Sequence, residues 1–570
     1  MYDSRGMSWN WSLSRAAGVM VLFALVLLPF VTSISMPSMP RFYFRSQDLP
    51  VIVTFAGAMV LLLWRQPSWS LPKKLPAART VWIAASLLAA LLWAGTHLIM
   101  FDYPLTRDEH MVAFDAANFA GGRLGTVLPT EWRGYAEALV PNFLITAEGW
   151  QVMASAYLPV NAMMRASFGM LLDPALMNPL LVSIGLVVLW SLSRKIFAEE
   201  TGAVWVAMLT FLLSGQLLTN SMTHYAMTSH VVFNLVWLAL FLRGGPVAHA
   251  LAMVVGFLAI GLHQPIFHPL FAGPILLGLL WQKRLGLFAI YAAVYAAALL
   301  LWFSYPVLVV ENLGLERSDE GSAAGAVGFI TERIVPLLTR IDPAVVQLML
   351  ANLLRAIAWN AAYLLPLLLI AAVSWRQIDA LGKQLLAGLV LTIVVIAILL
   401  PYQGHGWGYR YIHALIGSLC LLAGYGWRLI PQEQKPAAQG GIVALALVSV
   451  LALPFQWWSS HRFVEAHLKL YDIAKSQPTD FVLIDSELPS HAVDDVRNLP
   501  DLSNRPLLFS SREMNQTMID ELCKRGTLAV LTREDFRSVG LAHNVPVRSS
   551  VFEKKAQVLE GKGCVRPVKR

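Results

Sequence analysis

Four ionisable side chains lie close together in one short segment of the chain: Asp108, Glu109, His110 and Asp115. The segment is amphipathic, so we expect a helix that opens with the two acidic residues Asp108 and Glu109. The helix dipole stabilises a carboxylate at the N-terminus, which would explain one of them as a cap. An apolar wall raises a carboxyl pKa towards that of a general base, which would explain the cluster as a site of proton transfer. The residue types alone leave both interpretations open.

The elements that must position this cluster are membrane helices. Hydrophobic residues make up 57% of the 570 residues, charged residues make up 14%, and the mean hydropathy is +0.58. The apolar residues form blocks of about 16 to 25 residues, a length typical of membrane-spanning helices rather than of barrel strands. Backbone polar groups inside a bilayer must be satisfied within their own segment, which a helix achieves. The sequence therefore predicts an all-α polytopic membrane protein.

We expect about thirteen spans, and the cluster around Asp108 follows the third. They lie near residues 16–36, 49–64, 80–101, 174–196, 201–219, 229–243, 246–262, 267–282, 285–309, 356–375, 384–401, 412–430 and 440–457. Basic residues such as Lys73 and Lys383 gather in connectors that are therefore predicted to be cytoplasmic. The N-terminus is then cytoplasmic, and the loops 102–173 and 310–355 and the C-terminal tail lie outside. The same distribution explains the net charge of +8 without a nucleic-acid partner.

The tail beyond the last span changes in composition, and we expect a small α/β domain there, periplasmic by the span count. Its short apolar runs are typical of buried strands and lie at 481–485, 505–509 and 527–531. Cys523 and Cys564 both fall in this domain, so a disulfide between them is one expectation and two free thiols are the other. Cys420 lies inside a span and is expected to be a small buried apolar residue.

The order of several short motifs resembles a known family. Pro104, Asp108 and Glu109 after a span, followed by a helix ending in Phe-Ala-Gly-Gly-Arg-Leu, resemble the first outer loop of the GT-C glycosyltransferases. The nearest branch is the bacterial one (glycosyltransferase family 39-like), related to protein O-mannosyltransferases and aminoarabinose transferases. Ser193-Arg-Lys-Ile-Phe197 and Gly406-Trp-Gly-Tyr-Arg-Tyr411 are similar to later motifs of that family. The resemblance covers about residues 100 to 430.

The resemblance implies a reaction and assigns roles in it. A sugar would pass from a polyprenyl phosphate to an acceptor hydroxyl with inversion, and Asp108 would be the general base. Glu109 would orient the acceptor or share the proton. Arg410 would stabilise the departing phosphate, with a snorkelling interfacial arginine as the alternative. His263 lies where the family often has a phosphate-binding arginine.

Four further residues complete the candidate substrate-binding set with His263 and Arg410: His110, Asp115, Tyr409 and Tyr411. Other histidines are expected on the outer side, namely His224, His230, His268 and His405, so a divalent metal is left open although no recognised ligand spacing is present. No other cofactor is assigned. Trp132, Tyr135 and Trp150 of the first outer loop are left open between sugar stacking and structural roles.

The resemblance also implies a domain plan and a cellular location. We expect a transmembrane hairpin and linker at 1–79, a GT-C-like transmembrane catalytic core at 80–457, and the periplasmic α/β domain at 458–570. The expected location is a bacterial inner membrane. The expected partners are the lipid-linked sugar donor, membrane lipids and an acceptor glycan, lipid or protein, and no nucleic acid.

Three other functions compete with a glycosyltransferase. An O-antigen-ligase-like or polymerase enzyme would use a lipid pyrophosphate glycan, and it typically relies on paired arginines in a large outer loop. A transporter or flippase for a lipid-linked glycan should place ionisable residues near the midplane, whereas the expected spans are nearly free of them. A functional tail domain on a membrane anchor would not need so many spans.

Overall fold

The structure is a computed structural model in which most of the chain is described. The described residues are 38–65, 67–140, 143–145, 152–198, 200–315, 343–487, 490–541 and 561–570, with single positions among 13–22 and at 559. Most of the expected first span, 16–36, and Trp150 lie outside the described residues.

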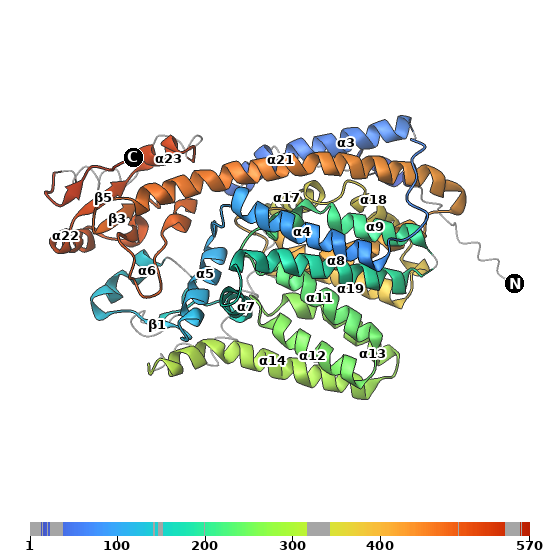
Figure 1. Ribbon diagram of the computed structural model, residues 1–570, viewed down its shortest axis with the longest axis horizontal. Coiled ribbons are helices and arrows are strands. Elements are labelled where there is room, and N and C mark those ends of the chain that lie inside the picture. The colour runs from blue at the N-terminus through green and yellow to red at the C-terminus, as the bar shows by residue number, and fades with distance from the viewer. Residues whose placement is uncertain are drawn as a thin grey trace.

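Apolar helices form the body of the molecule and lie side by side in one bundle (Figure 1). Within the described residues, six helices are long and apolar enough to cross a membrane. They contain α3 (Leu49–Trp64), α4 (Ala78–Leu98), α8 (Met177–Ile196), α14 (Leu285–Asn312), α19 (Ala380–Leu399) and α21 (Lys435–Lys475). Shorter helices complete the bundle: α9 (Thr201–Leu212), α11 (Met227–Arg243), α12 (Pro246–Ile260), α13 (Phe267–Trp281), α17 (Pro343–Ala358), α18 (Leu364–Val373) and α20 (Ile416–Arg428). The expected fold class, a polytopic helical membrane protein with a small C-terminal sheet, is confirmed.

Two expected spans are broken, because polar side chains inside them pair with each other. The span expected at 201–219 divides into α9 and α10 (Gly215–Asn220), and the span expected at 356–375 divides into α17 and α18. Ser214 donates from Oγ to Asn360 Oδ1 at 2.7 Å, and the backbone N–H of Gln216 donates to the Trp359 carbonyl at 2.7 Å. The two breaks thus satisfy each other's polar groups, which a low-dielectric interior requires.

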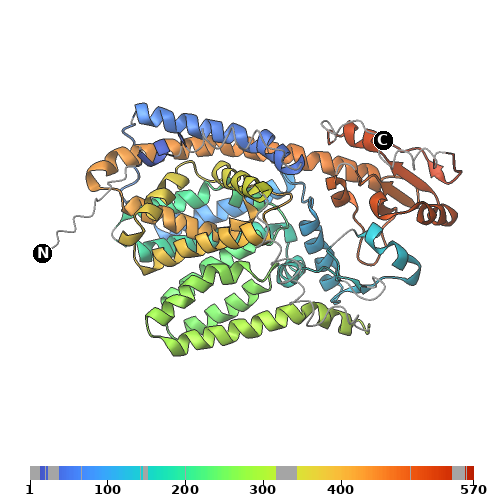
Figure 2. The same cartoon turned by 180° about the vertical axis from the view of Figure 1, so that it is seen from behind.

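The last apolar helix is longer than expected. The span expected at 440–457 is the middle of α21, which runs from Lys435 to Lys475 through the expected boundary at residue 458. α21 lies beside α3 along the bundle and continues to the C-terminal sheet (Figures 1 and 2). Its residues Leu470 and Ala474 pack against Val482 of the sheet. The helix therefore connects the two regions rigidly, while the domain division itself stays a prediction.

The C-terminal region is built on a parallel sheet with the strand order β4–β3–β5–β6. The strands are β3 (Phe481–Ile484), β4 (Leu507–Ser510), β5 (Leu528–Leu531) and β6 (Val565–Arg566), so the expected strands are confirmed. Strands β3, β4 and β5 are buried throughout, because α21 and the first outer loop cover opposite faces. Cys523 and Cys564 form the expected disulfide, with Cα atoms 5.3 Å apart, and Cys420 is free and buried.

The segment 102–173, expected to be the first outer loop, joins the bundle to this sheet. It contains α5 (Arg107–Ala120), the short strands β1 (Thr126–Val127) and β2 (Val152–Met153), α6 (Ala136–Leu139) and α7 (Val160–Gly169). Phe114 of α5 shares an apolar core with Phe509 of β4. Trp132 and Tyr135 pack in the same core, and the Arg525 guanidinium lies 5.3 and 5.7 Å from their ring centroids. These two rings therefore hold the loop on the sheet and do not line the cavity described below.

Candidate active site

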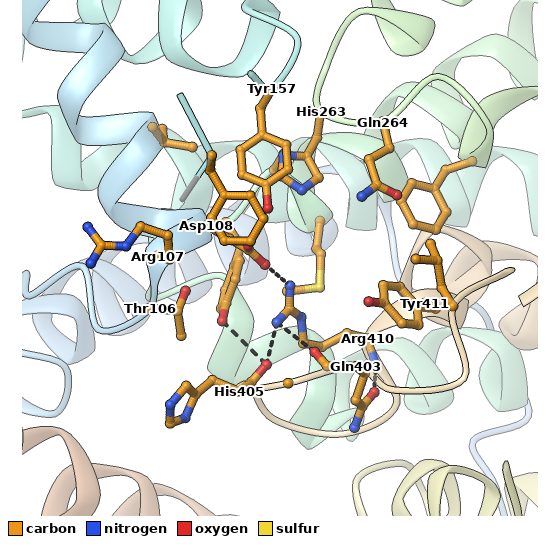
Figure 3. A pocket seen from close by; sticks show the side chains of 18 of the residues that line it. Thr106, Arg107, Asp108, Tyr157, His263, Gln264, Gln403, His405, Arg410 and Tyr411 are labelled. Carbon is orange, nitrogen blue, oxygen red and sulfur yellow. Dashed lines mark hydrogen bonds and ion pairs between the residues drawn. The ribbon is translucent and has the colours of Figure 1, made fainter. Parts of the chain in front are cut away.

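A cavity of about 390 Å³ lies at the end of the bundle that faces the C-terminal sheet. Its walls come from the N-terminus of α5, the turn between α12 and α13, the loop 401–411 and a segment of the C-terminal region that includes Asp494. Residues distant in sequence thus meet around one space, as Figure 3 shows.

An ion pair between Asp108, which is partly exposed to the cavity, and the buried Arg410 lies in the wall of the cavity (Figure 3). Arg410 Nη2 donates to Asp108 Oδ2, and the Tyr157 hydroxyl donates to Asp108 Oδ1 at 2.6 Å. Burial opposes ionisation of Asp108, but the charge of Arg410, the protonated form of His263 at low pH and the Tyr157 hydrogen bond outweigh it and hold the pKa below its usual value. The carboxylate is therefore ionised at neutral pH.

The loop 401–411 aims Arg410 into the cavity instead of towards solvent. Arg410 donates from Nη1 to the Gln403 carbonyl at 3.1 Å and also to the His405 carbonyl, while its guanidinium lies 4.5 Å from the ring centroid of Tyr225. Gly406 has a φ of +124°, and a Cβ there would lie 2.3 Å from Arg410 Cδ, so only glycine fits. The arginine is 8% exposed, a position that does not fit a snorkelling side chain.

Buried polar residues of the bundle hold this loop from below. The Tyr409 amide donates to Gln216 Oε1 at 3.0 Å, and Gln216 Nε2 donates back to the Tyr409 carbonyl at 2.8 Å. Asn220 donates to the Trp407 carbonyl at 2.9 Å. The break between α9 and α10 therefore turns Gln216 and Asn220 towards the loop that carries Arg410, where their hydrogen bonds hold it.

His263 and Tyr157 form the wall on the other side of Asp108. Their ring centroids are 4.0 Å apart, and the rings are inclined by 34°. Burial lowers the pKa of His263 to about 4 despite the nearby Asp108 carboxylate, so the imidazole is neutral at pH 7. A neutral imidazole donates one hydrogen bond through a ring N–H. His263 can therefore supply a donor, but not a second full charge, to an anion beside Arg410.

The cavity also contains a carboxylate from the C-terminal region, which the sequence did not indicate. Asp494 Oδ2 lies 3.3 Å from His405 Nε2, and Asp494 Oδ1 lies 3.9 Å from Arg107 Nε. The Tyr43 hydroxyl lies 2.8 Å from His405 Nδ1. Burial opposes ionisation of Asp494, but His405 and Arg107 outweigh it and lower its pKa. Nothing local to the sequence of the tail signals this contact, because its partners lie 89 and 387 residues away.

The structure brings four of the eight candidate residues to the cavity: Asp108, His263, Arg410 and Tyr411. Tyr157, Gln403 and Asp494 line it as well, and none of the three was a candidate in the sequence. Tyr411 stacks its ring on Phe267 with centroids 6.2 Å apart.

The other four candidates make contacts away from the cavity lining. Glu109 completes a capping box with Thr106 and accepts a hydrogen bond from the His224 amide at 3.1 Å. His110 Nδ1 lies 2.9 Å from Arg107 Nη1. Asp115 accepts from the Ser155 amide at 2.9 Å, and Tyr409 is held through its backbone. Of the acidic pair, Glu109 thus caps the helix and Asp108 faces the cavity.

The outer histidines do not gather around one point. His224 pairs with Asp102 at 2.7 Å, and His268 contacts Asn234 Oδ1 and the Tyr295 hydroxyl, both at 2.7 Å. Among the residues that the structure describes, no three His, Cys, Asp or Glu side chains are grouped as a metal ion would require.

These features define a multi-pass helical membrane protein with a charged cavity at one end of its bundle. Two crystal structures of ArnT from Cupriavidus metallidurans, one bound to undecaprenyl phosphate and one in the apo state, are similar to the chain. Each is 13% identical and covers 82% of this chain and 89% of its own, with TM-scores of 0.46 and 0.45. No family model and no curated protein matches the chain, so we base its function on its own cavity.

Proposed function

We propose that the protein is a membrane glycosyltransferase that transfers a sugar from a polyprenyl phosphate to an acceptor hydroxyl in this cavity. The observation that carries the proposal is the Asp108–Arg410 ion pair in the wall of a cavity at the end of an apolar bundle. A carboxylate can accept a proton, and a guanidinium can bind a phosphate through charge-assisted hydrogen bonds. Both groups face the same space.

The ion pair makes donor binding precede proton transfer to Asp108. In the ligand-free protein Arg410 lowers the pKa of Asp108, which makes the carboxylate a weak base. A donor phosphate that binds Arg410 shares its positive charge, so the proton affinity of Asp108 rises when the donor is in place. His263 would add a neutral N–H to the phosphate. Donor binding thus prepares the base for the acceptor.

The chemical step then needs no further group. The acceptor oxygen attacks the anomeric carbon, its proton passes to Asp108, and the bond from that carbon to the phosphate oxygen breaks. The electron pair leaves with the lipid phosphate, where Arg410 offsets the charge. Attack from the side opposite the phosphate inverts the anomeric centre.

The bundle explains why the donor is a lipid. The apolar chain of a polyprenyl phosphate would remain in the bilayer around the helices, while its phosphate reaches the cavity at their end. We place the protein in a bacterial inner membrane with its N-terminus cytoplasmic and the C-terminal region periplasmic. The acceptor is a hydroxyl of a glycan, lipid or protein.

The test is a transfer assay with the full chain in lipid nanodiscs and a polyprenyl-phosphate hexose as donor, followed through release of polyprenyl phosphate. We expect Arg410→Ala to lower kcat/KM by about a hundredfold to a thousandfold, as for removal of a charge-stabilising donor. Arg410→Lys should retain part of the activity, because it keeps the charge and loses the fork geometry. The matched control is Arg428→Ala at the far end of α20, where the arginine pairs with Asp379 at 3.8 Å. Equal activity in Arg410→Ala and Arg428→Ala would refute the proposal.

A further inference from the structure

We propose that the C-terminal region contributes Asp494 to the active site as a positioning residue, which holds Arg410 in place through His405. The inference rests on the proposed function, because it concerns the arginine that binds the donor phosphate. It assigns to the C-terminal region a part in donor binding, in addition to its part in the fold.

The first step is the wall that this region forms. Residues 493–498 pack against the first outer loop through hydrogen bonds to main-chain atoms. Arg107 donates to the Val493 carbonyl and, at 3.2 Å, to the Val496 carbonyl. Arg497 donates in the opposite direction to the Leu105 carbonyl at 2.8 Å. These reciprocal contacts place Asp494 in the cavity wall, where its side chain is 9% exposed.

The second step is the state of His405, which lies between Asp494 and Tyr43. An ionised carboxylate can only accept hydrogen bonds, so Asp494 selects the tautomer of His405 with its proton on Nε2. Nδ1 is then the acceptor for the Tyr43 hydroxyl at 2.8 Å. Burial lowers the pKa of His405, which keeps this ring neutral at pH 7. Tyr43 contacts one ring nitrogen and Asp494 lies beside the other, and the two together restrain the orientation of the ring.

The third step leads from His405 to the arginine. The His405 carbonyl accepts from Arg410 Nη1, while Gly404 and Gly406 on either side have positive φ angles of 65° and 124°. Glycines in such conformations leave the backbone free to move when no side chain restrains it. The imidazole of His405 restrains the backbone at this point, together with Arg355, which donates to the Gly406 carbonyl at 2.6 Å. Asp494 therefore fixes the carbonyl that orients the guanidinium of Arg410.

Binding of a sugar-free polyprenyl phosphate to the full chain in nanodiscs tests the inference without depending on turnover. We expect Asp494→Asn, which keeps the shape and removes the charge, to weaken binding by about threefold to tenfold, the range of one lost hydrogen bond. Arg410→Ala should weaken it by more than tenfold. Asp494→Glu should recover part of the loss. Asp501→Asn is the control, because that carboxylate is exposed and caps a turn at Ser503 in the same region.

A double-mutant cycle separates positioning from general support of the fold. If Asp494 acts through Arg410, Asp494→Asn has no further effect on binding in the Arg410→Ala background. Additive losses of affinity in the double mutant would overturn the inference. It would also be overturned if Asp494→Asn bound polyprenyl phosphate as tightly as the wild type and had the same unfolding temperature. Absence of binding by the wild-type chain would refute the proposed function and this inference together. If Arg410→Ala weakened binding and Asp494→Asn did not, only the inference would be refuted.

Discussion

Two aspartate–arginine pairs hold the loop 401–411, and they differ in what surrounds them. Asp48 and Arg355 lie 3.2 Å apart between α3 and α17, with exposures of 0% and 3%. Trp359 donates to Asp48 at 2.7 Å, and Arg355 donates to the Gly406 carbonyl at 2.6 Å. The pair of Asp108 and Arg410 is bound to the same loop but opens to a cavity.

Only one of the two pairs can exchange partners. A pair enclosed by protein can only be kept or broken, and breaking one leaves an uncompensated charge in a low-dielectric interior. A pair beside a cavity can give up part of its mutual attraction to a ligand. We therefore assign the Asp48 pair to stability and the Asp108 pair to chemistry. Asp48 and Arg355 each lie one residue before an expected span, 49–64 and 356–375, and the structure buries both of them.

The largest expected effect concerns the enclosed pair. Asp48→Asn should lower the free energy of unfolding by about 3–5 kcal/mol, because Arg355 would remain buried without its partner. Unfolding of the detergent-solubilised protein measures this. Replacing both residues with apolar side chains should restore much of the stability. A large loss of activity in Asp48→Asn without a loss of stability would reverse the assignment.

Asp108→Asn tests the open pair. It should lower glycosyl transfer by at least about a hundredfold, the usual contribution of a general base. The unfolding temperature should change little, since Arg410 borders the cavity and keeps its hydrogen bonds to the Gln403 and His405 carbonyls. The transfer assay and thermal unfolding of the same preparation decide this. A variant that is active but unstable would place Asp108 with Asp48 as a structural residue.

Asp115, on the same helix as Asp108, should make the stability of the protein depend on pH. Burial raises the pKa of Asp115 to about 7 from 3.8, so the folded state favours its protonated form. Its contribution to stability is therefore full below about pH 3.8 and is lost as the pH rises to about 7, with a slope of at most about 1.4 kcal/mol per pH unit. Asp115→Asn should remove this slope. The measurement is the free energy of unfolding of the wild type and of Asp115→Asn between pH 4 and 8. The same pH dependence in both proteins would contradict the expectation.

The smallest expected effect belongs to Glu109. Glu109→Gln weakens the capping box with Thr106 and should cost about 1 kcal/mol of stability. Transfer activity should fall by no more than a few fold, because Glu109 does not line the cavity. Steady-state kinetics beside Asp108→Asn measure the contrast. Equal losses in the two variants would mean that Glu109 shares the proton after all.

Local patterns account for the parts of the fold that were predicted. Hydropathy located the helices, apolar runs located β3, β4 and β5, and the compartment of Cys523 and Cys564 pointed to their disulfide. The end of α21 was missed because hydropathy falls after residue 457 while the helix continues. Its buried residues Val464, His467, Leu470 and Ala474 recur at helical spacing, so an amphipathic pattern could have found it.

Most of the membrane helices, the start of α5 and the residue types of the site could be predicted from the sequence, because each depends on neighbours along the chain. Which carboxylates face the cavity depends on how the chain packs in three dimensions. Asp108 and Arg410 are 302 residues apart, and Asp494 reaches the same wall from the C-terminal region. Glu109, next to Asp108, turns to a backbone cap instead. Successive helical residues point in different directions, so the packing of α5 against the bundle and the sheet assigns one carboxylate to the fold and the other to the site.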